Sequence, residues 1–253
     1  MRTRRCCLTL LVILILMGCA WRLQAEQRPP SDETEAEKWV KEGLDAYAQR
    51  SLTFTKNEQG LVLVTWTNRD GKSGALNMVL LKSMGPVQLE NGLWTVHYAI
   101  AGDKTDYWER LGNRDHVERY REGLLFLARD SQKRWDDLAA KSLETFRAQA
   151  DTWRELAAKP KLPDDVYAHK VLAEEAYRNK DLMKALSEYQ LGIKAFPTWP
   201  EGQFNAALIA AEMEYYRVAV QRMKEYLLLA PDAPDAQAAK DKIIVWQDKI
   251  VTF

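Results

Sequence analysis

Two consecutive stretches of equal length decide the fold: residues 164–197, DDVYAHKVLAEEAYRNKDLMKALSEYQLGIKAFP, and residues 198–231, TWPEGQFNAALIAAEMEYYRVAVQRMKEYLLLAP. When they are aligned, small residues and prolines recur 34 residues apart, in the pairs Ala173 and Ala207, Ala185 and Ala219, and Pro197 and Pro231. A fixed period of this length is typical of stacked helical hairpins, because each hairpin must bury a face of its neighbour. We therefore predict an all-α array of hairpins over residues 164–253, a structure that usually holds another polypeptide.

The starts of the predicted hairpins follow the same period. Asp164, Thr198 and Asp232 each stand where a side-chain oxygen is expected to cap a helix. Thr198 and Glu201 also have the spacing of a capping box. Residues 234–251 are predicted to form a terminal capping helix, whose apolar stripe consists of Ile243, Trp246 and Ile250.

This stretch resembles the tetratricopeptide repeat family over residues 166–252. In that family each unit is a pair of antiparallel helices, with small residues where the helices cross and a proline that closes the unit. Carried over position by position, the resemblance implies that the repeats pack through Ala173, Ala185, Tyr189, Pro197, Ala207, Ala219 and Pro231. The sequence departs from the family at Gly192 and Tyr226, where alanine is usual, and at His169 and Gln203, where an aromatic residue or leucine is usual. Two units are fewer than the three that such arrays usually need, so we expect neighbouring helices to close the stack.

The resemblance also implies a binding surface. In the family the concave face is lined by the first helix of each unit, which here supplies Tyr167, Lys170, Glu174, Tyr177, Arg178, Glu201, Phe204, Leu208, Ala211 and Glu212. Exposed aromatic side chains among charged ones suit a protein or peptide partner anchored by a few residues. The alternative is that Phe204 and Leu208 pack on a neighbouring helix and that the charges are solvated. The family's clamp for chaperone tails needs Lys and Asn at fixed groove positions, and Glu174 and Leu208 occupy one of these, so that activity is not implied.

The first residues of the chain have the features of an export signal. Arginines near the N-terminus precede the apolar run 8–17, which is short for a membrane span because a span needs about 20 apolar residues. The run ends in Leu-Met-Gly-Cys at 16–19, which resembles the lipobox of bacterial lipoproteins, in which the cysteine takes the lipid. We therefore predict a signal peptide over 1–19, lipidation of Cys19 and a tether over 20–31.

The resemblance to lipoproteins also implies a location. Because Ala20, rather than aspartate, follows the cysteine, the resemblance implies the outer membrane of a bacterial envelope, with the protein facing the periplasm. Two alternatives stay open: cleavage after Ala25, which would release a soluble periplasmic protein, and retention of the apolar run as an anchor.

Residues 32–158 are predicted to form an α+β domain ahead of the helical array. Asp32 and Glu35 have capping-box spacing before a helix over 33–49. Period-two alternation predicts strands at 52–55, 61–67, 76–81 and 93–100, separated by turn residues. We expect these strands to form one antiparallel meander, covered on one face by helices.

Helical spacing resumes after the last predicted strand. Asp103 is placed to cap a short helix that stops near Gly112. Apolar stripes then predict a helix around 117–127 and a long amphipathic helix over 135–157. Two prolines within 159–163 mark the main boundary between the α+β domain and the array.

Composition excludes several kinds of chemistry. The chain has 36 basic and 36 acidic residues, so no overall field attracts nucleic acid. Its cysteines, Cys6, Cys7 and Cys19, all precede residue 20, which excludes disulfides, thiol catalysis and cysteine-bound metal from the folded body.

Histidines and carboxylates give no catalytic pattern. His97, His116 and His169 lack the spacing of a catalytic or metal site, and HExxH, P-loop and GxSxG motifs are absent from the sequence. Asp130, Asp136 and Asp137 are expected to be solvated. We therefore expect no enzymatic activity, cofactor or metal.

Together, these features predict a membrane-anchored periplasmic scaffold that binds a protein or peptide partner of an envelope complex. Two other classes are weighed against it. In one, the α+β domain encloses a small ligand; in the other, the protein is a hydrolase of cell-wall material.

Overall fold

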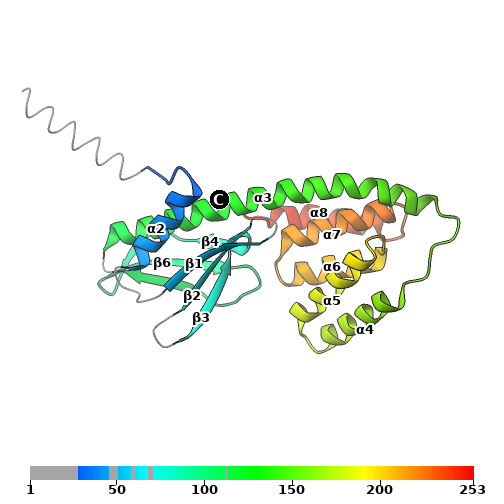
Figure 1. Ribbon diagram of the computed structural model, residues 1–253, viewed down its shortest axis with the longest axis horizontal. Coiled ribbons are helices and arrows are strands. Elements are labelled where there is room, and N and C mark those ends of the chain that lie inside the picture. The colour runs from blue at the N-terminus through cyan, green and yellow to red at the C-terminus, as the bar shows by residue number, and fades with distance from the viewer. Residues whose placement is uncertain (1–27, 46–50, 58–60, 68–70, 112) are drawn as a thin grey trace, which may run out of the picture.

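The computed structural model of the protein describes residues 28–45, 51–57, 61–67, 71–111 and 113–253. The predicted signal peptide, Cys19, Ala25 and most of the tether lie outside the described residues. Within the described ranges, no helix is both long and apolar enough to cross a bilayer. The fold is α+β, with two antiparallel sheets in the N-terminal part followed by an array of helices (Figure 1).

Helix α2, Glu33–Asp45, begins where the sequence predicts. The Oδ1 atom of Asp32 accepts a hydrogen bond from the backbone N of Glu35 at 2.9 Å, which confirms the cap. The Glu35 carboxylate accepts a bond from the backbone N of Ser31 at 2.7 Å, one residue further back than in a capping box. The predicted end of this helix, residues 46–49, is outside the described part of the chain.

The strands form two separate sheets instead of the single predicted meander. The first sheet contains, in spatial order, β1 (Ser51–Lys56), β2 (Val62–Thr67) and β3 (Ser73–Asn77). In the second sheet, β6 (Leu93–Ile100) pairs along one edge with β4 (Leu81–Met84) and β5 (Gln88–Glu90) and along the other with β7 (Tyr107–Leu111). The strands predicted at 52–55, 61–67 and 93–100 are confirmed.

The strand predicted at 76–81 is divided between the two sheets. β3 ends at Asn77, and a 3₁₀ turn, Met78–Leu80, carries the chain into β4. The Asn77 side chain accepts a hydrogen bond from the backbone N of Val79 at 3.0 Å, and the Met78 side chain is fully buried. The corner between the sheets lies in the core and must itself be apolar, so its sequence resembles an uninterrupted strand.

The short helix predicted after Asp103 is wrong, because this segment leads into β7. The Oδ1 atom of Asp103 accepts a hydrogen bond from the backbone N of Thr105 at 2.8 Å, so the aspartate stabilises a turn. Tyr107 then stacks on Tyr98 of β6 with ring centroids 5.4 Å apart, a cross-strand pair that favours the sheet. Gly112, the predicted end of that helix, is not among the described residues.

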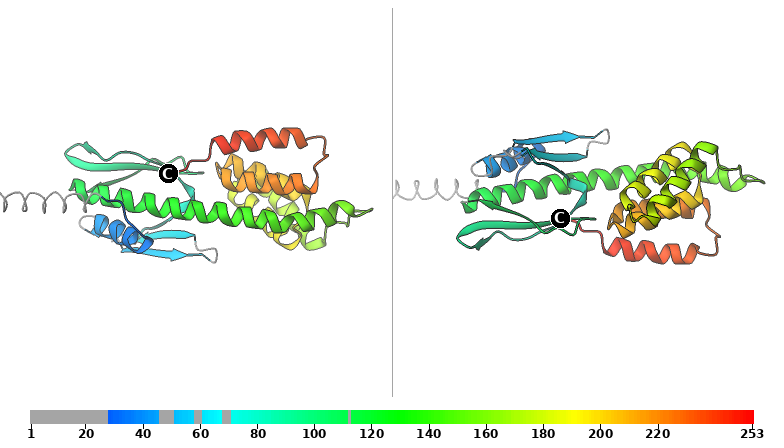
Figure 2. Two further views of the ribbon diagram at one scale, coloured as in Figure 1. Left: turned by 90° about the horizontal axis from the view of Figure 1, so that it is seen from above. Right: turned by 90° about the horizontal axis from the view of Figure 1, so that it is seen from below.

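A single helix, α3 (Arg114–Glu155), replaces the two helices predicted between the sheets and the array. Its apolar stripe is interrupted by two buried polar side chains and not by a break in the helix. Ser131 Oγ accepts a bond from the backbone N of Val62 at 3.3 Å, and Gln132 Nε2 donates to the carbonyl of Leu81 at 3.3 Å. This turn of α3 is thereby bonded to both sheets, which diverge to either side of the helix in Figure 2.

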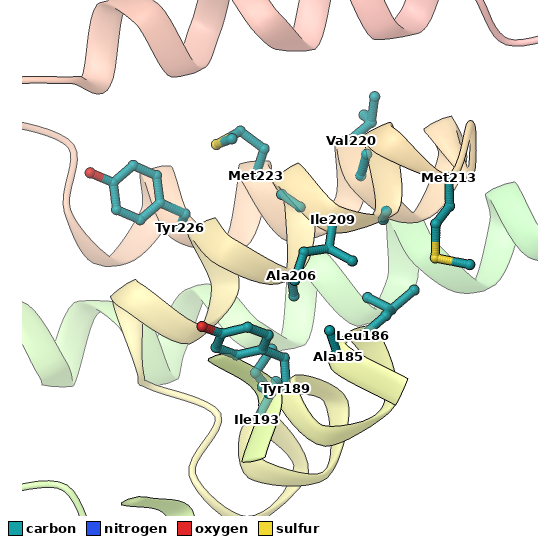
Figure 3. Close-up of a cluster of buried hydrophobic side chains, with 14 of the residues drawn as sticks. Ala185, Leu186, Tyr189, Ile193, Ala206, Ile209, Met213, Val220, Met223 and Tyr226 are labelled. Atoms are coloured by element: carbon teal, nitrogen blue, oxygen red, sulfur yellow. The ribbon is translucent and has the colours of Figure 1, made fainter. Parts of the chain in front are cut away.

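Five further helices complete the chain and confirm the helical-hairpin array: α4 (Asp164–Arg178), α5 (Leu182–Ala195), α6 (Pro200–Glu212), α7 (Tyr216–Leu229) and α8 (Ala236–Asp248). Helices α4 and α5 form the first hairpin, and α6 and α7 form the second. Helix α8 packs on α7 at the predicted terminal position. The side chains at the helix crossings are buried in one core, where Tyr189 of α5 and Ile209 of α6 lie between the hairpins (Figure 3).

The predicted caps of the array are wrong. Asp164 is the first residue of α4 and not its cap, while Thr198 and Asp232 lie in the turns before α6 and α8. Trp199 and Asp235 occupy the actual cap positions and make no side-chain capping bond. Proline at the first position of α6 and packing between the hairpins define these helix starts instead.

Helix α3 closes one side of the array, as two units require. Its C-terminal half packs Phe146, Ala150 and Trp153 against Leu229 at the end of α7 and Phe196 after α5. The rings of Trp153 and Phe196 meet edge to face at a centroid distance of 5.9 Å. Because α5 and α7 are the second helices of their hairpins, the first helices, α4 and α6, remain on the side that α3 does not cover.

The turn between α6 and α7 docks on the sheets. Gly102, in the turn before β7, has a φ of +78°, and a Cβ there would lie 2.9 Å from the carbonyl oxygen of Met213. Only glycine permits this close approach. Lys82 Nζ lies 2.6 Å from Glu214 Oε2 across the same junction.

The segment after α8 returns to the N-terminal part. Arg217 of α7 donates from Nη2 to the carbonyl of Val251 at 3.2 Å and from Nε to Asp136 of α3 at 3.2 Å. Phe253 packs against the core formed by α2, α3 and the sheets. The array and the sheets therefore share several contacts besides α3.

Ala185 and Ala219 are fully buried at the helix crossings, so we predict that replacing either with leucine overpacks the array. The expected loss in free energy of unfolding is about 1–3 kcal/mol, measured by denaturant unfolding. Ala238→Leu, on the exposed side of α8, is the matched control and should change stability by less than about 0.5 kcal/mol. Equal stability of all three variants would contradict the packing described.

Candidate partner-binding groove

The candidate groove lies between α4 and α6, the first helices of the two hairpins. Two polar contacts join these helices across it. Lys170 Nζ donates to Glu201 Oε1 at 2.7 Å, and the Tyr177 hydroxyl donates to Glu212 Oε2 at 3.2 Å. Four of the residues that the sequence predicted for a binding surface are therefore brought together in pairs.

Between these two contacts is an open hollow of about 310 Å³. Its wall contains four of the predicted groove residues, Glu174, Tyr177, Arg178 and Leu208. Tyr189 of α5 and Asn205 and Ile209 of α6 complete it. The hollow combines apolar side chains with an amide, carboxylate and tyrosine groups, a mixture that suits a peptide side chain.

The floor of the hollow is fixed by a buried tyrosine. Tyr189 is only 3% exposed, and its hydroxyl accepts a hydrogen bond from Nδ2 of Asn205 at 3.1 Å. Burial raises the pKa of Tyr189, so the hydroxyl stays protonated and is able to donate a bond in turn. At the rim, the negative charge of Glu212 raises the pKa of Tyr177.

The groove carries more negative than positive charge. Glu174, Glu201 and Glu212 lie on this side with one ammonium, Lys170, whose pKa is raised by its hydrogen bond to Glu201. Arg178, which lines the hollow, is paired with Glu175 at 2.5 Å, so that pair adds no net charge. A partner segment with basic side chains complements this surface.

The remaining predicted groove residues have other surroundings. Phe204 is half buried and meets the ring of Tyr226 at a centroid distance of 5.0 Å, so it packs on a neighbouring helix as the alternative interpretation expected. Ala211 also packs against the core. Leu208 contacts the core and lines the hollow. Tyr167 is exposed on α4 outside the hollow.

Sequence reasoning missed two residues of α6 that line the hollow, Asn205 and Ile209. Asn205 lies four positions after Glu201 and three before Leu208, so helical spacing places all three on one face. That spacing was sufficient to identify Asn205. Ile209 follows Asn205 by four and belongs to the same face.

One small hollow lies inside the described residues of the α+β part. The hollow bounded by α2, α3 and the sheets, including Trp66 and Glu109, has a volume of about 10 Å³. This is at the lower limit for one water molecule, which needs about 10–15 Å³ measured in this way.

Two histidines have carboxylate partners that the sequence did not reveal. His97 Nδ1 lies 3.0 Å from Asp106 Oδ2, and its Nε2 lies 3.1 Å from Glu90 Oε1. The hydrogen bonds to Asp106 and then Glu90 raise the pKa of His97 above its ordinary value of 6.5. His169 Nδ1 lies 2.8 Å from Glu188 Oε2.

The carboxylates considered as metal ligands are engaged in ion pairs. Asp130 and Asp137 lie 2.6 Å from Arg134 and Lys133, respectively, one helical turn away on α3. In the part of the chain that the structure describes, histidines, cysteines and carboxylates do not gather into a group that fits a metal ion.

No known protein family, curated protein or solved structure matches this chain. The functional interpretation of the groove therefore depends on its own geometry and on the sequence.

The two hydrogen bonds that His97 forms with carboxylates predict that the stability of the protein depends on pH. Because folding raises its pKa, the stabilisation is fully present below about pH 6.5 and is lost as the pH rises through the raised value. The difference in free energy of unfolding between the native protein and His97→Gln, measured from pH 5 to 9, should therefore shrink with rising pH. A difference that is constant over this range would show that the two carboxylates do not hold the imidazolium.

Proposed function

We propose that this protein is a lipid-anchored scaffold of a bacterial envelope, whose tetratricopeptide-like array holds a segment of a partner protein between α4 and α6. The observation that carries the proposal is the open hollow on that face, with Tyr177 and Leu208 in its wall. On the opposite side, α3 packs against the ends of α5 and α7. The helices are thus fixed from one side and accessible from the other.

The groove defines the chemistry of the proposed partner. Tyr177, Tyr189 and Leu208 offer apolar and aromatic surface, and Glu174 and Glu212 contribute negative charge. A helix or extended peptide with an apolar anchor next to a lysine or arginine complements both features.

The location is proposed from the sequence alone. Acylation of Cys19 would hold the chain at the membrane, because each buried CH₂ contributes about 0.8 kcal/mol and several chains together give a stable anchor. The segment up to residue 31 would then serve as the tether, with α2 as the first folded element. Cleavage after Ala25 is the alternative and would leave the protein soluble in the periplasm.

Photo-crosslinking in cells tests the proposed groove. A photoreactive phenylalanine analogue in place of Tyr177 should give a discrete crosslinked product, because this side chain is in the wall of the hollow. The same analogue in place of Leu138, which is 41% exposed on α3, is the matched control and should not give that product.

Truncation of side chains in the wall of the hollow should then weaken binding of the captured partner. Two groove truncations, Tyr177→Ala and Leu208→Ala, are each expected to cost about 1–2 kcal/mol, or roughly 5- to 30-fold in Kd, by titration calorimetry with that partner. Products that form equally from positions 177 and 138, or unchanged Kd for both truncations, would refute the groove as the binding site. Loss of the product in a Cys19→Ala strain would show that the anchor is needed for the encounter.

A further inference from the structure

Helix α4 exposes a face whose counterpart in the second repeat, on α6, is packed against another helix. With the 34-residue period, its residues Ala168, Val171, Leu172 and Glu175 correspond to Gly202, Asn205, Ala206 and Ile209 of α6. In α6 this face packs on α5, where Asn205 bonds to Tyr189 and where Ala206 and Ile209 are buried (Figure 3). Helix α4 has no preceding hairpin in the described chain, and Figure 1 shows it at the free end of the array.

The exposed face of α4 is apolar where an end unit is usually polar. Val171 is 43% exposed and Leu172 is 46% exposed, and each is larger than its buried or half-buried counterpart in α6. The terminal units of repeat arrays need polar outer faces to stay soluble, because their inner faces are already occupied. Branched apolar side chains at this position therefore indicate a face that is covered in the functional protein.

The distribution of charge along α4 indicates which molecule covers this exposed face. Val171 is the midpoint of the helix, with Asp164 at its start and Arg178 at its end. Fourteen residues correspond to about four turns, so Asp164 and Arg178 lie almost in line on the helix surface. When two copies of α4 lie antiparallel, the apolar centres meet and Asp164 of each copy lies beside Arg178 of the other.

The same arrangement places the small Ala168 of one copy near Glu175 of the other, one residue out of register. Arg178, which already holds Glu175, has further N–H groups for the incoming carboxylate. The dipoles of the two helices also oppose each other, which is favourable for antiparallel neighbours. A surface that is complementary to itself in this way is what a two-fold dimer requires.

We infer that two copies of this chain associate through α4 about a two-fold axis, with Val171 and Leu172 at the centre of the interface. The proposed interface and the partner groove use different sides of α4, because Lys170 and Glu174 lie on the side that faces α6. Arg178, which also lines the hollow, is shared by the two, so Leu172→Glu is the variant that separates them. The dimer would present two grooves to partners at a fixed spacing.

Sedimentation velocity of the full chain in a density-matched detergent tests this dimer over a range of protein concentrations. The native protein should pass from monomer to dimer as concentration rises. Leu172→Glu should raise the dimer Kd by at least 100-fold, because it buries two unpaired charges in the apolar centre. Leu138→Glu, on the exposed surface of α3, is the control and should leave the Kd unchanged.

Charge reversal separates the two-fold arrangement from other contacts. Arg178→Asp should weaken the dimer roughly tenfold, because each dimer contains the pair twice and an exposed ion pair contributes little by itself. Adding Asp164→Arg to the same chain should restore the affinity. Thermal melts of the variants are measured alongside, and each should unfold cooperatively as the native protein does.

A native protein that is monomeric at all concentrations, or Leu172→Glu that dimerises as well as native, would overturn the inference. So would a double variant no tighter than Arg178→Asp alone. Failure here does not affect crosslinking from position 177, so the dimer and the groove are judged separately.

Discussion

The structure depends on one helix, α3, which forms a wall of two hydrophobic cores. Its N-terminal half buries Val117, Leu124 and Leu127 against α2 and the sheets. Its C-terminal half buries Phe146 and Trp153 against the ends of α5 and α7. With 42 residues at 1.5 Å each, α3 is about 63 Å long. A helix packed along both halves cannot bend between them without opening one of the cores.

Helix α3 also explains how an array of two hairpins is stable. Stacked hairpins bury their faces against neighbours, and two units leave a large share of that surface open. Here α3 covers the ends of the second helices, and the turn between α6 and α7 docks on the sheets at Gly102. The first helices do not take part in this closure, so stability of the array does not require the groove between them to be filled.

The sequence was most informative where a structural requirement makes the same residue type recur at a fixed spacing. The alanines at helix crossings recur because closely packed backbones admit no larger side chain, and this period predicted the hairpins. The helix caps of the array were poorly predicted, because Thr198 and Asp232 are suitable residues that the actual helix starts do not use. The residues that meet in the groove were largely predictable from their positions in the repeat. The packing of the Phe204 side chain toward the core was not, because it depends on the ring of Tyr226 on another helix.

In the α+β part, the sequence prediction failed where the role of a residue depends on tertiary contacts. Ser131 and Gln132 break the apolar stripe of α3 because both bond to the sheets, and only the tertiary structure supplies those partners. The corner at Met78 is apolar because it is buried, so no turn residue separates β3 from β4. Asp103 resembles a helix cap because caps and turns use the same side-chain acceptor.

The contact of Phe253 with the N-terminal core has a consequence for the order of events during synthesis. The residues of α2, the sheets and α3 are synthesised long before Phe253. Until Phe253 is made, the part of the N-terminal core that it covers is exposed to water. The N-terminal core therefore gains this last contact only when residues 249–253 lie back across the junction, beside Arg217 of α7.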